Sequence, residues 1–111
     1  MADLPIEIDC LATSRLQSDR ADFLLLDCRG ADEYATASIA GATLIPMNEL
    51  PDRVAELGAD KARRIVVHCH HGGRSLRVAN WLRGQGYLQA QSLAGGIDAW
   101  SQEIDPAVPR Y

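Results

Sequence analysis

The fold is decided by residues 64–75, which read RIVVHCHHGGRS. The first part is a short apolar run, typical of a buried strand, and it leads into Cys69. Gly72 and Gly73 follow closely and indicate a tight turn. Residues 74–83 then carry apolar side chains at helical spacing. The segment therefore predicts a strand, a cysteine at its end, a glycine-rich loop and a helix.

A cysteine in such a loop has the surroundings of a nucleophile. Backbone N–H groups of the loop can point toward its centre, and the positive end of the helix dipole lies beside it. Both features stabilise a thiolate, which is the reactive form of cysteine. We therefore predict that Cys69 is a nucleophile held in a cup of N–H groups and open to a substrate. A merely buried cysteine is the competing interpretation, and the glycines and Arg74 disfavour it.

Composition limits the classes of function. A chain of 111 residues fits one domain, here taken as residues 1–111, and 47% hydrophobic with 23% charged residues is ordinary for a globular protein. The formal net charge of −4, without a basic stripe, excludes nucleic acid as an expected partner. A local group of basic side chains can still attract a small anion, and it comprises Arg63, Arg64, Arg74, Arg77 and Arg83.

The cellular location is predicted from the N-terminus and the cysteines. The first residues contain no basic segment followed by an apolar run, so no secretion signal is expected. No apolar stretch approaches the length of a membrane span, so no membrane partner is expected. Three cysteines, an odd number, argue against a disulfide framework. Together these features predict a reducing cytoplasm.

Predicted strands and helices alternate along the chain. Strands are expected at residues 5–8, 23–26, 41–46, 65–68 and 89–93, and helices at residues 9–17, 32–37, 51–57, 74–83 and 97–100. This alternation predicts an α/β fold with a mostly parallel five-stranded sheet and helices on both faces. Ligands bind such sheets at the carboxyl ends of the strands. Residues 105–111, which include two prolines, are expected to lie extended on the surface.

Several short motifs, in this order and spacing, resemble the rhodanese (thiosulfate sulfurtransferase) family over nearly the whole chain. They are residues 26–29, 33–34, 39–42, 45–46, 69–75, 93–100 and 108–111. The family commonly has Gly-His-Ile-x-Gly-Ala where residues 37–42 read ASIAGA, which we take as a local change of turn. Cys28 stands where valine is more common in the family, so the resemblance implies that a second thiol could lie near the predicted site. The resemblance implies the three-layer rhodanese fold.

The resemblance also implies a reaction. Cys69 takes a sulfane sulfur from a donor such as thiosulfate, becomes a persulfide, and passes the outer sulfur to cyanide, a thiol or a partner protein. The loop residues that would bind the persulfide are His70, His71, Gly72, Gly73, Arg74 and Ser75. Arg74 would hold the loop or meet the donor's oxygens, and Ser75 would contact the sulfur or cap the helix. No cofactor and no metal are expected.

Two other functions are weighed against this one. Cysteine phosphatases on related folds use Cys-x5-Arg, whereas Cys69 and Arg74 are spaced Cys-x4-Arg and Ser75 occupies the next position. A loop shorter by one residue suits a sulfur atom better than a phosphate, so phosphatase or arsenate-reductase chemistry is disfavoured. A sulfur-carrier module that delivers the persulfide to a partner enzyme remains open.

Residues around the loop are assigned supporting roles. Asp27 and Arg29 are expected to tie neighbouring loops together, with Arg29 the better candidate for a role in the site. Glu33 is interpreted as a first-turn helix charge. His68 is expected to be a hydrogen-bonded structural residue.

The remaining cysteines and the tryptophans are interpreted as structural. Cys28 is interpreted as a buried strand-end thiol in preference to a resolving one, and Cys10 as core. Trp81 and Trp100 are read as core or helix-packing residues. The three histidines, which adjoin Cys69, do not easily converge on one metal ion.

Overall fold

The computed structural model describes residues 4–111. Five strands form one sheet in the order β1-β5-β4-β2-β3, and every neighbouring pair is parallel. The strands are β1 (Glu7–Ile8), β2 (Phe23–Asp27), β3 (Thr43–Leu44), β4 (Arg64–His68) and β5 (Ala90–Leu93). The prediction of a five-stranded, mostly parallel sheet is confirmed.

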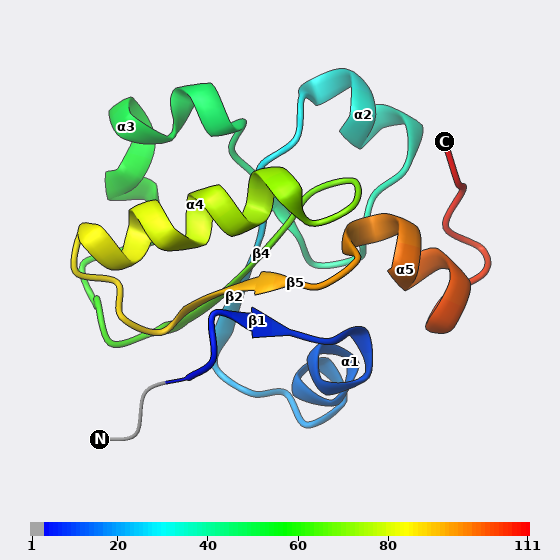
Figure 1. Cartoon of the computed structure of the whole chain (residues 1–111), viewed down its shortest axis with the longest axis horizontal. Helices are drawn as coiled ribbons and strands as arrows, with labels where there is room; N and C mark the ends of the chain where they lie inside the picture. The colour runs from blue at the N-terminus through cyan, green and yellow to red at the C-terminus, as the bar shows by residue number, and fades with distance from the viewer. Residues whose placement is uncertain (1–3) are drawn as a thin grey trace.

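The helices cover both faces of this sheet, as predicted (Figure 1). They are α1 (Cys10–Ser18), α2 (Ala31–Thr36), α3 (Leu50–Arg53), α4 (Gly73–Gly84) and α5 (Gly96–Glu103), with short 3-10 turns η1 (Met47–Glu49) and η2 (Val54–Leu57). Helices α3 and α4 pack on one face, and α1 and α5 pack on the other. The chain is therefore a three-layer α/β structure.

Local sequence signals explain where the elements begin and end. Asp9 caps α1, because its carboxylate accepts a hydrogen bond of 2.8 Å from the Ala12 N–H. Pro51 lies in the first turn of α3, where its missing N–H costs nothing. Strand β3 is shorter than the predicted residues 41–46, because Ala42 is held in a turn by its bond to Ile39.

Each face of the sheet carries its own apolar cluster. Alternate side chains of a strand point to opposite faces, so Val67 and Cys69 join the cluster under α3 and α4, whereas Val66 joins the cluster on α1 and α5. Trp100 is buried in the second cluster, as predicted, whereas Trp81 is only partly buried against the first. Cys69 therefore faces the layer that contains its own helix, α4.

The C-terminal tail differs in part from its prediction. Val108 is buried, its N–H bonds to the Asp105 carbonyl, and its carbonyl accepts a hydrogen bond from the Ser101 hydroxyl. The tail runs back toward α2 at the carboxyl edge of the sheet (Figure 1). Its last residue, Tyr111, bonds to Arg29 and Glu33. Most of the tail lies exposed on the surface, as predicted, but Val108 and Tyr111 hold it against α5 and the predicted site.

Within residues 4–111, no helix combines the length and the apolar character that crossing a bilayer requires. Residues 1–3, on which the expectation about a secretion signal partly rests, lie outside the described residues.

Candidate active site

Two of the backbone N–H groups predicted to face the Cys69 sulfur donate to it. The Gly72 N–H donates to Sγ over 3.1 Å and the Ser75 N–H donates over 3.3 Å. Gly72 adopts a φ of +108°, in the left-handed region that favours glycine, and α4 begins at the next residue. The strand, cysteine, glycine loop and helix therefore follow one another as predicted. Both N–H groups stabilise negative charge on the sulfur.

Ser75 joins the loop to the sheet beneath it. Its hydroxyl accepts from the Cys69 thiol at 3.4 Å, donates to the Gly72 carbonyl at 3.3 Å, and lies 2.7 Å from the Ser92 hydroxyl of β5. Of the two roles predicted for Ser75, the sulfur contact is present. The N-cap of α4 is Gly72, without a side-chain cap.

A second glycine pair supports the loop from below. The Ile97 and Asp98 N–H groups donate to the carbonyls of Cys69 and His70, at 2.9 and 3.1 Å. A Cβ built on Gly96 would lie 2.5 Å from the His70 oxygen and 2.6 Å from the Cys69 oxygen, so only glycine fits. Sequence reasoning quoted Gly96 as part of a family motif but missed this role. The signal was a Gly-Gly pair directly before a helix.

Arg74 holds the loop to helix α2. Its two terminal nitrogens donate to both Glu33 carboxylate oxygens, at 2.7 and 2.9 Å. Glu33 also accepts from the Tyr111 hydroxyl at 2.7 Å. The Arg74 bonds hold the pKa of Glu33 well below its usual value, at about 2. Glu33 is a first-turn charge of α2, as predicted, but its partnership with Arg74 was missed.

Asp27 and Arg29 form a fully buried ion pair beside the loop. The Arg29 guanidinium donates to both Asp27 oxygens, at 2.9 and 2.7 Å, and to the Ala37 carbonyl at 2.7 Å. It also donates to the Tyr111 hydroxyl over 2.8 Å. These contacts join the end of β2 to the residue after α2 and to the tail, which is the tying role that was predicted.

Aromatic rings lie over the first loop residues. The ring of Tyr111 stacks on His70, with centroids 3.9 Å apart and planes at 5°, and His70 stacks in turn on His71. Tyr111 was not predicted as a site residue, because a contact between the last residue and the loop leaves no local pattern. The loop is therefore held by α2, by β5 and by the tail.

His68 differs from its prediction. It is fully buried, but among residues 4–111 neither ring nitrogen has a hydrogen-bond partner, and Nε2 lies 3.8 Å from the Asp27 carboxylate. Asp27 is instead bonded to Arg29, which explains why it does not bond His68. Burial lowers the pKa of His68 to about 4.

The buried His68 predicts a pH-dependent stability. Unfolded chain binds a proton on this imidazole below about pH 6.5, whereas folded protein does so only near pH 4. The contribution of His68 to the free energy of unfolding is therefore complete above about pH 6.5. The free energy of unfolding falls by about 3 kcal/mol as the pH drops to 4. We expect urea unfolding of a His68→Leu variant to lose this slope. A wild-type slope in the variant would contradict the assignment. Loss of the Glu33 contribution falls lower, between pH 4.5 and 2.

Access to the thiol also differs from expectation. Cys69 is only 1% exposed, so the predicted opening to a substrate is wrong for this conformation. The sulfur turns inward to the N–H groups of Gly72 and Ser75 and packs in the cluster under α4. A reagent can reach it only when neighbouring side chains move.

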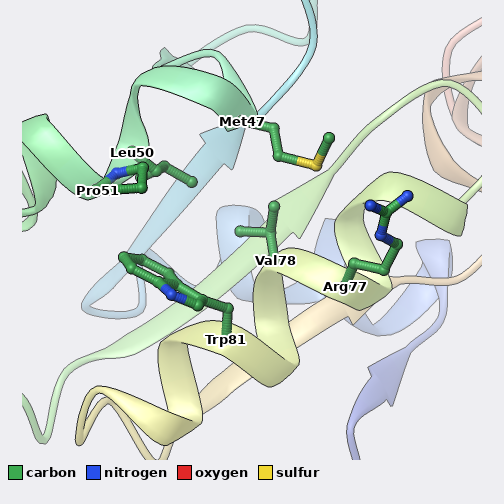
Figure 2. A pocket seen from close by; sticks show the side chains of 6 residues that line it. All are labelled: Met47, Leu50, Pro51, Arg77, Val78 and Trp81. Carbon is green, nitrogen blue, oxygen red and sulfur yellow. The ribbon is translucent and has the colours of Figure 1, made fainter.

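An apolar groove lies between α3 and α4 (Figure 2). Its volume is about 250 Å³, and it is lined by Met47, Leu50, Pro51, Arg77, Val78 and Trp81. Leu50 and Val78 belong to the same apolar cluster as Cys69, and Met47 packs against it. The partial exposure of Trp81 follows from its position on this groove.

Comparison with known proteins identifies the family. The rhodanese-like domain family matches residues 12–103, and the chain belongs to this family. A sulfurtransferase of Allochromatium vinosum is 37% identical over 102 residues, covering 92% of this chain and 94% of the relative. The thiosulfate sulfurtransferase GlpE of Coxiella burnetii is 35% identical over 81 residues, covering 73% of this chain and 74% of that protein.

A solved structure agrees with these matches. The rhodanese-like domain of the Anabaena sp. Alr3790 protein has a TM-score of 0.78 and is 30% identical, covering 89% of this chain and 75% of that chain. Some relatives are much longer, and the chain spans 30% and 23% of the lengths of two of them. The recognition of the family from the sequence motifs is confirmed.

Proposed function

We propose that the protein is a sulfurtransferase that carries the transferred sulfur as a persulfide on Cys69. The observation that carries this proposal is the pair of N–H groups, from Gly72 and Ser75, aimed at the Cys69 sulfur. An anionic sulfur at this position would accept hydrogen bonds from the same two N–H groups. Neither β4 nor α4 would have to move for this. Membership of the rhodanese family and the sulfurtransferase names of two relatives support the same chemistry.

The reaction has two half-steps, with thiosulfate as the proposed donor. The Cys69 thiolate attacks the sulfane sulfur of thiosulfate, the donor's S–S bond breaks, and sulfite leaves with the electron pair. An acceptor thiolate or cyanide then attacks the outer persulfide sulfur, and the Cys69 thiolate leaves. Ping-pong kinetics follow from this covalent intermediate. The name of the Coxiella burnetii relative supports thiosulfate as the donor.

The position of Arg74 disfavours phosphate chemistry. In a phosphate-binding loop an arginine must donate to oxygens inside the loop, whereas both terminal nitrogens of Arg74 already bond Glu33 outside it. Only two loop N–H groups converge on the sulfur. The site therefore suits one added sulfur atom better than a tetrahedral anion.

Sulfur loading tests this function directly. Protein incubated with thiosulfate is expected to gain the mass of one sulfur atom, and added cyanide is expected to remove it and release thiocyanate. Protein that gains no sulfur from thiosulfate or from an inorganic polysulfide would overturn the proposal. Release of phosphate from an aryl phosphate at a comparable rate would favour the phosphatase alternative.

The same experiment separates an enzyme from a carrier module. Loading without turnover by cyanide or small thiols would indicate that a partner protein is the acceptor.

The three cysteines are free thiols in the structure, which supports the reducing cytoplasm as the proposed compartment.

Arg74 is expected to act by holding the loop. Because Arg74→Ala and Glu33→Gln both remove the tie between α4 and α2, each is expected to lower kcat/KM for thiosulfate about tenfold, with the fold intact. If Arg74 instead meets the donor's oxygens, only Arg74→Ala raises KM. Arg53→Ala, which removes the partly exposed ion pairs of Arg53 with Glu49 and Glu56, is the matched control and is expected to leave the kinetics unchanged.

A further inference from the structure

Cys28 and Cys69 occupy equivalent positions at the ends of neighbouring strands. Asp27, the last residue of β2, is paired with His68, the last residue of β4, and a cysteine directly follows each of them. The Cys28 N–H still donates to the His68 carbonyl over 3.1 Å, so the two backbone segments remain side by side beyond the ends of the strands. Paired strands run about 4.8 Å apart, and disulfides join Cα atoms about 4.4–6.8 Å apart.

The two thiols also lie on the same face of the sheet. Leu26 and Cys28 on one strand, and Val67 and Cys69 on the other, all belong to the cluster under α3 and α4. Both cysteines are free and 1% exposed. Cys10 belongs to the cluster on the opposite face, so the sheet separates it from them.

The surroundings of the Cys28 and Cys69 thiols differ, and the difference suits the two thiols to different steps. Two N–H groups donate to the Cys69 sulfur and support its thiolate. Burial, and then the nearby charge of Cys69, raise the pKa of Cys28 to about 12. Cys28 is therefore a protonated thiol beside a sulfur that accepts two N–H hydrogen bonds, and it does not compete with Cys69 as the first nucleophile.

We propose that Cys28 is a resolving cysteine, which captures peroxide-oxidised Cys69 as an intramolecular disulfide. The Cys69 thiolate attacks one oxygen of hydrogen peroxide, the O–O bond breaks, and the sulfenic acid forms as the other oxygen leaves as hydroxide, which takes up the proton released by the Cys69 thiol to give water. The Cys28 sulfur then attacks the Cys69 sulfur, the S–O bond breaks, and the thiol proton leaves with the oxygen as a second water. Two thiols are oxidised by two electrons and one peroxide is reduced.

The disulfide would protect the site at the expense of its activity. It occupies the sulfur on which a persulfide would form, so the oxidised protein cannot load sulfur. It also prevents further oxidation of Cys69 to sulfinic acid, which ordinary thiols do not reverse. The high pKa of Cys28 slows its attack, but fixed proximity offsets this for an electrophile as strong as a sulfenic acid.

Peptide mapping after peroxide treatment tests this inference. Wild-type protein treated with hydrogen peroxide is expected to lose two hydrogens, and iodoacetamide added after unfolding should then alkylate only Cys10. Trypsin should then release peptides 21–29 and 65–74, which contain Cys28 and Cys69, joined to each other. Oxygenated Cys69 without this cross-link, or a cross-link to the Cys10 peptide, 1–15, would overturn it.

Variants provide the controls. With excess peroxide, Cys28→Ser and Cys28→Val are expected to carry two oxygens on Cys69, as the sulfinic acid that dithiothreitol does not reduce, instead of a cross-link. Valine guards against misfolding caused by a buried hydroxyl. After peroxide and then dithiothreitol, wild type and Cys10→Ser should regain sulfur loading, whereas both Cys28 variants should not. Full recovery in the Cys28 variants would contradict the inference. Because the cross-link is read without thiosulfate, its failure is distinguishable from failure of the proposed sulfur transfer.

Discussion

Replacing Cys69 with serine is expected to abolish sulfur loading and thiocyanate formation together. A serine hydroxyl stays protonated at neutral pH and does not attack a sulfane sulfur, so no persulfide can form. The serine is nearly isosteric with cysteine, and its oxygen can accept from the Gly72 and Ser75 N–H groups, so the fold should remain. The expected loss of turnover is about a thousandfold or more, as for other covalent nucleophiles.

Intact mass after incubation with thiosulfate measures this loss. Cys10→Ser is the matched control, because Cys10 is equally buried but lies on the opposite face of the sheet. It should load and release sulfur like the wild type. Sulfur retained by the Cys69→Ser variant would defeat the assignment of Cys69 as the carrier.

Replacing Arg29 with methionine is expected to remove much of the stability of the protein. The Asp27 carboxylate would stay fully buried without its partner, and breaking a buried pair in this way costs about 3–5 kcal/mol. Domains of this size are stable by about 5–15 kcal/mol, so the loss is a large fraction of the total. It would also release Ala37 and the tail residue Tyr111 from the end of β2.

Urea unfolding at pH 7 gives the size of this loss. An Asp27→Leu, Arg29→Met double variant should recover much of it, because no unpaired charge remains buried. Arg53→Met, which breaks only partly exposed ion pairs, should change stability little. An Arg29→Met protein with wild-type stability would show that the pair is not the tie we describe.

Several features of the site could be predicted from sequence because they depend on neighbouring residues. The apolar run before Cys69, the turn through Gly72 and the helix after it are all local patterns, and each lies within a residue or two of its predicted position. The alternation of strands and helices was enough to predict the parallel sheet. Strand β3 was overestimated, because a turn at Ala42 is not visible as a break in apolar character.

Contacts between distant segments could not be predicted in this way. Arg74 and Glu33 are separated by 41 residues, and Tyr111 is separated from Glu33 by 78. A charged side chain is common at the positions that Arg74 and Glu33 occupy in their helices, so the sequence around each residue does not indicate that the two form a pair. The same holds for His68, whose ring nitrogens find no hydrogen-bond partner in the described part of the chain because Asp27 is already bonded to Arg29.

The sequence alone determined the order of elements, the position of Cys69 at a strand end and the family to which the chain belongs. Strand periodicity, turn chemistry and motif spacing are short-range properties, and they are written directly in the order of residues. Only the tertiary structure decided that Cys69 is closed from solvent and that the strand ends before Cys28 and Cys69 are direct neighbours. The burial follows from the sulfur turning inward to the Gly72 and Ser75 N–H groups. The neighbouring position follows from the register of β2 against β4, which brings together residues that no local pattern connects.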